Sequence, residues 1–209
     1  ESRPSVEATL IGRLVDRPLR PLFPEGFYND THVVITTLSY DGINLPETIA
    51  ATGASLALSI SDIPFNGPVA GVIVGYVNGE YILNPSKEVL ENCDIFLSIA
   101  GTKDAITMVE AGAKEVSEEV MLGAIIFGHD RIKEICAFQE AFIELVGNKE
   151  KFAFEVKEPL AQVKEFVDAA EERIKEAVLT VGKQAREEAL ELIEEKLLEE
   201  FTVKALEGT

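Results

Sequence analysis

Arginine side chains near the start of the chain are the residues whose type and spacing most suggest chemistry. Four of the seven arginines occur within the first 20 residues, namely Arg3, Arg13, Arg17 and Arg20. Arg13 and Arg17 are four positions apart and would share one helix face, which Arg20 could extend. Planar guanidinium groups suit phosphate oxygens, and a row of them can follow a phosphate backbone without reading bases. From the residues alone, pairing of these arginines with Asp16 and nearby acids is an open alternative.

The chain as a whole is acidic, with a formal net charge of −18. Nucleic-acid binders are usually basic, so this average argues against such a partner. The arginines nevertheless form a basic spot on an acidic body, which would direct a polyanion to one place. No apolar run approaches the roughly 18–20 residues of a membrane span, and no signal segment opens the chain. Because the sequence begins at Glu1 rather than at a methionine, we expect a piece of a longer protein.

Neither the cysteines nor the histidines are arranged for catalysis or metal binding. Cys93 and Cys136 lie far apart, without a CxxC motif or a Cys/His cluster, so we expect two buried thiols in a reducing cytoplasm. His32 and His129 stand alone and are expected to be structural. We therefore predict no metal-ligating residue.

Hydrophobic periodicity and turn residues predict an α+β fold for the first part of the chain. Helices are expected over residues 5–16, 46–61 and 117–147, and strands over 33–39, 69–77, 80–83, 94–100 and 105–109. Pro18 should end the first helix and leave residues 18–24 extended. Asn78-Gly79 is the preferred dipeptide of a tight hairpin. Because hairpins rather than crossovers join the middle strands, the sheet should be largely antiparallel and packed with helices.

The last third of the chain predicts a small all-α domain. Residues 148–156 change in character and indicate a linker. Apolar residues then recur at helical spacing, at Leu160, Val163, Val167, Ala170, Ile174 and Val178. Gly182 breaks this pattern, and a second helix should carry Ala189, Ile193, Leu197 and Phe201 on one face. The prediction is a helical hairpin.

Several sequence blocks, in order, resemble the first core domain of the bacterial polynucleotide phosphorylase family. The longest is Arg3-Pro4-Ser5 with Leu10-Ile11-Gly12-Arg13-Leu14-Val15-Asp16-Arg17-Pro18-Leu19-Arg20-Pro21-Leu22-Phe23-Pro24-Glu25-Gly26-Phe27. The others are 53–59, 63–68, 75–79, 100–102, 108–110 and 121–124 with 127–129. The resemblance implies a ribonuclease-PH-like core over residues 1–148 that lacks its first strands. Residues 149–209 resemble the family's helical linker domain in pattern and place.

The family resemblance also implies a function. Its members degrade RNA from the 3′ end with phosphate as co-substrate and with Mg²⁺, and release nucleoside diphosphates. Each subunit has two core domains joined by the helical domain, followed by KH and S1 domains, and three subunits form a ring. We therefore expect RNA as partner, a homotrimer, possible partners in an RNA-degradation complex, and a cytoplasmic location without membrane contact. The family's matching arginines line the RNA path, which favours RNA contact for Arg13, Arg17, Arg20 and Arg3.

The same resemblance implies that this part of the protein is not catalytic. Ribonuclease-PH-like active sites carry a phosphate-binding arginine before the small-residue helix, and Glu47 stands at that position here. A carboxylate there would repel phosphate. The acidic positions of such sites match Asp94 and Glu88, but without the arginine we predict no catalytic residue and place the Mg²⁺ outside this chain. The alternatives are a stand-alone ribonuclease-PH-type exonuclease and a purely structural assembly module.

Overall fold

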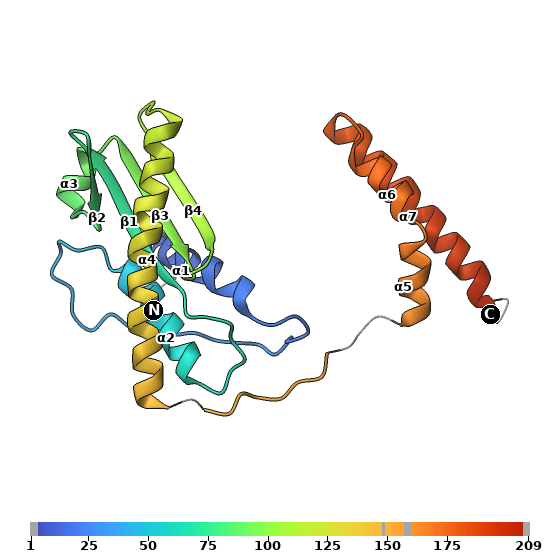
Figure 1. Cartoon of the computed structure of the whole chain (residues 1–209), viewed down its shortest axis with the longest axis horizontal. Coiled ribbons are helices and arrows are strands. Elements are labelled where there is room, and N and C mark those ends of the chain that lie inside the picture. Colours follow the sequence, from blue (N-terminus) through green and yellow to red (C-terminus); the bar gives the residue numbers. More distant parts are fainter. Residues whose placement is uncertain (1–3, 148, 157–159, 207–209) are drawn as a thin grey trace. The chain divides into compact units, whose positions relative to one another are not determined.

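The computed structural model describes residues 4–147, 149–156 and 160–206 (Figure 1). The chain divides into two compact units, Glu1–Val156 and Lys157–Thr209. This division lies later than the predicted boundary between residues 148 and 149. The assignment of these two parts to a core domain and a helical linker domain stays a prediction.

The first unit is built on a four-stranded antiparallel sheet with the order β2-β1-β3-β4. The strands are β1 Ala70–Val77, β2 Glu80–Leu83, β3 Ile95–Gly101 and β4 Ile106–Ala113. Asn78 and Gly79, which join β1 to β2, have φ angles of 52° and 84°, as a tight two-residue hairpin requires. The α+β class and the antiparallel sheet predicted from the sequence are therefore confirmed.

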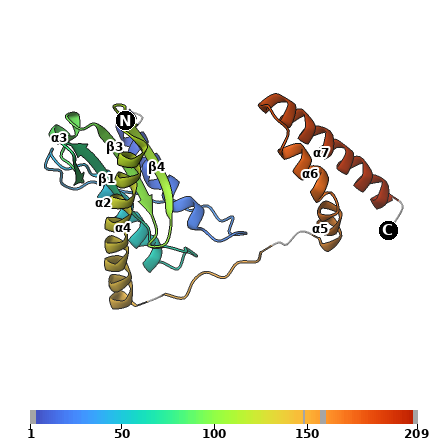
Figure 2. The ribbon, with the colours of Figure 1, turned by 45° about the horizontal axis from the view of Figure 1, so that its top comes forward.

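Two long helices cover the two faces of the sheet. Helix α4, Glu118–Val146, lies across it in both Figure 1 and Figure 2, and its buried residues pack with Val72, Val74, Leu97 and Ile99. Helix α2, Glu47–Ile60, approaches the other face, where Ala51 lies next to Gly71. Since successive strand residues point to opposite faces, Gly71 faces α2 and Val72 faces α4. A short helix that the sequence did not predict, α3 Lys87–Glu91, follows β2.

Helix α1, Val6–Leu19, continues through Pro18 and passes into the 3-10 helix η1, Arg20–Leu22. The predicted end before Pro18 and the extended segment 18–24 are therefore wrong; the backbone becomes extended only at Phe23. A proline inside a helix costs about 3 kcal/mol. Pro18 and Leu19 are buried, however, and Leu19 packs against α2. Burial contributes about 1.5–3 kcal/mol for each such side chain, so packing outweighs the local preference.

The strand predicted over residues 33–39 does not form, and the structure has neither helix nor strand there. Val34 and Leu38 are 72% and 93% exposed. A strand requires a neighbour for its backbone hydrogen bonds, and β1 to β4 pair only with one another. The β-branched residues of this segment favour a strand, but no strand in the described residues lies beside it to pair with.

Residues 149–156, predicted to be a linker, are held against the first unit. The Lys151 ammonium donates to the carbonyl oxygens of Ser59 and Ser61, at 2.8 and 2.7 Å, just where α2 ends. The Phe152 amide donates to the Asp62 carbonyl at 2.7 Å, and the Phe154 ring packs edge-on against Phe27. Partial burial lowers the pKa of Lys151. Residues 149–156 therefore pack as part of the first unit.

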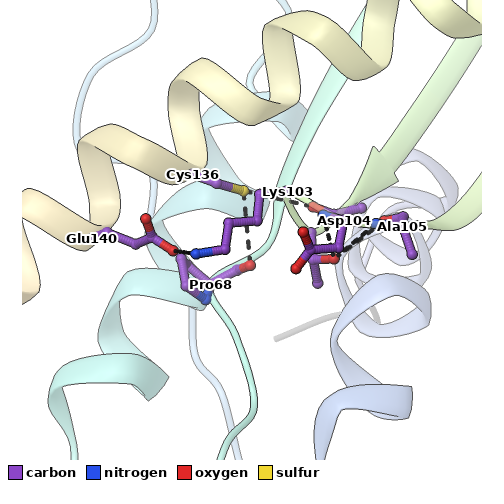
Figure 3. A network of polar contacts seen from close by, with 8 residues as sticks. Pro68, Lys103, Asp104, Ala105, Cys136 and Glu140 are labelled. Atoms are coloured by element: carbon purple, nitrogen blue, oxygen red, sulfur yellow. Dashed lines mark hydrogen bonds and ion pairs between the residues drawn. The ribbon is translucent and has the colours of Figure 1, made fainter.

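A polar network fastens the turn between β3 and β4 to α4 (Figure 3). Lys103 forms an ion pair with Glu140 at 2.7 Å, and a ring nitrogen of His129 lies 3.1 Å from the Thr102 carbonyl oxygen. The buried Cys136 thiol donates to the Pro68 carbonyl, and burial raises its pKa to about 11. His129 and Cys136 thus make the backbone contacts that a structural role requires. Cys93 is also buried as a free thiol.

In its described residues, 160–206, the second unit has three helices, α5 Ala161–Asp168, α6 Glu171–Val178 and α7 Lys183–Leu206. The first helix predicted for the hairpin is therefore two helices, α5 and α6. They are separated at Ala169-Ala170, and Ala170 is buried. Gly182 has a φ of 95° and separates α6 from α7, as predicted. The face with Ala189, Ile193, Leu197 and Phe201 is half-buried, and Phe201 meets Phe166 edge to face. No helix in the described parts of the chain is long and apolar enough to cross a membrane.

Candidate nucleic-acid interface

Helix α1 presents the predicted arginines to solvent while its opposite side enters the core. Its buried residues Val15 and Leu19 pack with Ala54 and Leu58 of α2. Ser5 caps the helix by accepting a hydrogen bond from the Ala8 amide at 3.0 Å, which fixes where the helix begins. The amphipathic pattern of α1 therefore turns its polar residues outward.

Three of the four predicted arginines belong to the described residues, and they lie along the outer side of α1 and at the start of η1. Arg13 and Arg17 are one helical turn apart, and both are exposed. Arg20 is the first residue of η1, and its side chain is 76% exposed. Arg3, the fourth predicted residue, lies outside the described residues. Arg13, Arg17 and Arg20 thus lie on one continuous segment, which we call the arginine segment.

Two of these arginines already have acidic partners. Arg20 pairs with Asp16 one turn earlier, at 2.7 Å, and Arg17 pairs with Glu110 of β4, at 2.5 Å. Arg13 makes no ion pair with any residue that the structure describes. The sequence alternative of pairing with Asp16 is therefore realised for Arg20.

The strength of these pairs decides whether they exclude a phosphate. The side chains of Arg17 and Glu110 are 46% and 54% exposed. Exposed ion pairs contribute only about 0–1 kcal/mol, because water screens both charges. The arginines therefore remain accessible to an anion that approaches from solvent, and they are not locked in buried salt bridges.

A groove of about 880 Å³ runs beside this segment. Its walls include Arg20 and Asp16 of the arginine segment, together with the aromatic rings of Phe23, Phe27 and Tyr28. Phe23 and Phe27 stack with their ring planes 7° apart. Arg20 is the one arginine of the segment that lines the groove, together with the carboxylates of Asp16 and Glu25. A cation beside aromatic rings is a combination that proteins use to contact the backbone and bases of single-stranded nucleic acids.

The residues expected at a ribonuclease-PH-like catalytic centre do not meet in one place. Glu47, at the start of α2, lines a small depression with Leu14, Ser98, Ala100 and Met108. Asp94 precedes β3, four residues before Ser98, which corresponds to about 13 Å along a strand. Its carboxylate lies 4.0 Å from the Lys114 ammonium. Glu88 belongs to α3. No cation lies among the residues that line the depression at Glu47.

Mg²⁺ sites combine one or two carboxylates with substrate oxygens and water in octahedral geometry. The predicted absence of a metal-ligating residue in this chain stays a prediction. Within the described residues, no group of three or more histidine, cysteine, aspartate or glutamate side chains is placed to hold a metal. The carboxylate of Asp94 instead faces a lysine.

Glu110 is the site residue that sequence reasoning missed. It is 93 positions from Arg17, so no local pattern links the two. The sequence carried one signal. Glu110 follows Met108 by two residues in a strand, so the two side chains lie on the same face of the sheet. Only the packing of α1 against β4 brings the carboxylate to the arginine.

Comparison with known proteins identifies a family that the chain matches. Residues 1–64 match the 3′ exoribonuclease family, domain 1, and residues 67–131 match the 3′ exoribonuclease family, domain 2. Together these matches cover more than half of the chain.

The chain is similar over nearly all its length to bacterial proteins named polyribonucleotide nucleotidyltransferase. It is 52% identical to that of Listeria welshimeri over 210 residues, which is 100% of this chain and 29% of the relative. The protein of Streptococcus gordonii is 52% identical over 94% of this chain and 27% of its own length. That of Enterococcus faecalis is 50% identical over 98% of this chain and 29% of its own length. The chain thus spans under a third of these relatives.

A solved structure has the same fold. The crystal structure of rice (Oryza sativa) Rrp46 aligns with a TM-score of 0.54, covering 68% of each chain at 16% sequence identity. At this identity the likeness concerns the fold alone.

Proposed function

The chain belongs to the 3′ exoribonuclease family, and we propose that it serves as the RNA-binding, non-catalytic part of a polyribonucleotide nucleotidyltransferase. In this proposal the complete enzyme degrades mRNA processively from the 3′ end, uses phosphate as co-substrate and releases nucleoside diphosphates. The observation that carries the proposal is the exposed arginine segment of α1 and η1, with Arg13, Arg17 and Arg20.

The arginine segment suits a strand that moves through the enzyme during processive degradation. Guanidinium groups contact phosphates, which repeat along every strand regardless of base. Contacts that carry no sequence information permit the RNA to advance without a change in affinity from one position to the next. The exposed ion pairs fit this role, because weakly held arginines exchange partners at little cost.

Absence of catalysis in this part is supported by the surroundings of Glu47. This carboxylate occupies the position where the family's phosphate-binding arginine is expected. Asp94 precedes β3 and is about 13 Å along the strand from Ser98, which lines the same depression as Glu47. Phosphate would meet a negative charge there without a compensating cation among the lining residues. In the proposal, Mg²⁺ and phosphate act in a part of the enzyme outside these residues.

Assembly is the second proposed role, favoured by the exposed apolar segment near residues 33–39. Val34, Ile35 and Leu38 are exposed, and monomeric proteins rarely leave large contiguous apolar patches in water. A homotrimer in the cytoplasm, with further partners of RNA degradation, is the arrangement we propose. Light scattering of the purified chain measures its mass in solution and tests self-association directly.

The RNA assignment is tested by replacing Arg13, Arg17 and Arg20 together with glutamine. We expect weaker binding of oligoadenylate and a flatter dependence of affinity on salt. Each phosphate contact on a single strand contributes a slope of about 0.7, so the loss should be about 2. A matched control replaces three lysines of the second unit with glutamine and removes the same charge: Lys164, Lys183 and Lys196.

Two outcomes would overturn the proposal in different ways. Unchanged RNA affinity in the arginine variant, with the fold intact, would remove the RNA-binding role. Release of nucleoside diphosphates from poly(A) by the chain alone, with phosphate and Mg²⁺, would show that this part carries an active site of its own.

A further inference from the structure

The ion pair between Arg17 and Glu110 joins the RNA-binding helix to the edge of the sheet. We propose that Glu110 is an internal competitor for RNA, which occupies Arg17 in the free protein and is displaced by an incoming phosphate. This inference rests on the proposed RNA-binding role of the arginine segment. It assigns to Glu110 a regulatory task at that site, namely to weaken RNA binding.

The contact geometry leaves the pair open to exchange. One oxygen of Glu110 accepts from one nitrogen of Arg17, Nη1, at 2.5 Å. About half of each side chain is exposed, so a phosphate can approach the guanidinium from solvent while the carboxylate is still bound. A single contact at the surface can be replaced without unfolding either element.

Glu110 differs from Asp16 in the element that holds it. Asp16 and Arg20 lie one turn apart in the same helical segment and can adjust together. Glu110 is fixed in β4, where it pairs with Ser98 of β3 in the strand register. Its carboxylate cannot follow Arg17 far, so a phosphate that takes the Nη1 donor of Arg17 breaks this pair.

Electrostatics gives the direction and size of the effect. A phosphate bound to Arg17 would lie about 6 Å from the Glu110 carboxylate, and at that distance two like charges in water repel by about a factor of three in affinity. Salt reduces this repulsion, because the screening length falls below 10 Å above about 0.1 M ionic strength. Neutralising Glu110 should therefore tighten RNA binding at low salt and have less effect at high salt.

The test is a double-mutant cycle on oligoadenylate binding, with the full chain and the variants Glu110→Gln, Arg17→Gln and both together. Glutamine keeps the shape and one acceptor oxygen of Glu110, removes the charge and puts an amide nitrogen in place of the second oxygen. Glu80→Gln is the matched control, since Glu80 is an exposed glutamate of β2 at the opposite edge of the sheet. Thermal unfolding of each variant checks that the fold is retained.

We expect Glu110→Gln to bind oligoadenylate about threefold more tightly at low salt, and Glu80→Gln to bind as the unmodified chain does. In the Arg17→Gln background the gain should fall to the level of the control. If Arg17→Gln weakens binding but Glu110→Gln leaves it unchanged or weakens it, the competitor proposal fails and the RNA-binding role stands. If Arg17→Gln leaves binding unchanged, Arg17 is not an RNA contact. The proposed RNA-binding role of Arg17 and the proposed competition by Glu110 then both fail.

Discussion

Gly128 of α4 sits where the helix comes closest to the sheet. A Cβ atom placed there would lie 2.8 Å from a methyl carbon of Ile99 and 3.0 Å from one of Val74. Carbon atoms pack best at about 3.5–4.0 Å, so an alanine would force the helix and the strands apart. We therefore predict that Gly128→Ala destabilises the first unit.

The magnitude follows from two opposing effects. Overpacking of a well-filled core costs about 1–3 kcal/mol. Replacing glycine with alanine inside a helix returns about 1 kcal/mol through helix propensity. Gly53 of α2 isolates the second effect, because it is also inside a helix and its added Cβ would meet nothing within 4 Å. The free energy of unfolding of Gly128→Ala should thus lie about 1–3 kcal/mol below that of Gly53→Ala.

Urea unfolding followed by tyrosine fluorescence measures this difference. The chain contains no tryptophan, and all four tyrosines lie before residue 82, so the signal reports on the first unit alone. The Gly53→Ala variant should be as stable as the unmodified chain or more stable. Equal stability of the two variants would refute the close contact of α4, at Gly128, with β1 and β3.

Two further predictions concern titratable groups. The Asp41 carboxylate accepts from the Asn44 and Ile43 amides, which lower its pKa below 3.8; stabilisation of this turn should be present above pH 3.8 and lost as pH falls through the lowered value. An NMR titration measures that pKa, and a value at or above 3.8 would contradict the turn geometry. Burial raises the pKa of Cys136 to about 11. Iodoacetamide at pH 8 should therefore modify Cys136 only after the chain unfolds, and rapid labelling of the folded chain would show that the thiol is accessible.

Elements whose signals are local were predictable from the sequence. Asn78-Gly79 requires two positive φ angles and specifies the hairpin by itself. Ser117 caps α4 by accepting from the Val120 amide, so the helix begins where the sequence indicates. The spacing of Arg13 and Arg17 likewise placed both on one side of α1. In each case the controlling contacts span four residues or fewer.

Features that depend on distant partners were predicted poorly. The segment 33–39 has strand-forming residues but no adjacent strand among the described residues, so its preference is not realised. Pro18 was expected to end α1, yet burial with Leu19 against α2 outweighs the local cost. The link from Arg17 to Glu110 spans 93 positions and follows only from the packed fold. Tertiary packing, which local patterns do not encode, decided all three.

The proposed RNA contact depends on the charges near α1 rather than on the charge of the whole chain, and these local charges predict weak binding. A bound phosphate senses mainly charges within about 10 Å, so the net charge of −18 is not the relevant quantity. Near the arginine segment, the three cations Arg13, Arg17 and Arg20 are accompanied by several acids. Asp16 and Glu110 pair with two of them, Glu25 lines the groove beside Arg20, and Glu47 lies in the depression beside Leu14. With these acids so close to the cations, RNA should bind only at low salt. We therefore expect Glu110, whose carboxylate is held in β4, to influence RNA affinity more than Asp16, which lies on the same helical segment as its arginine.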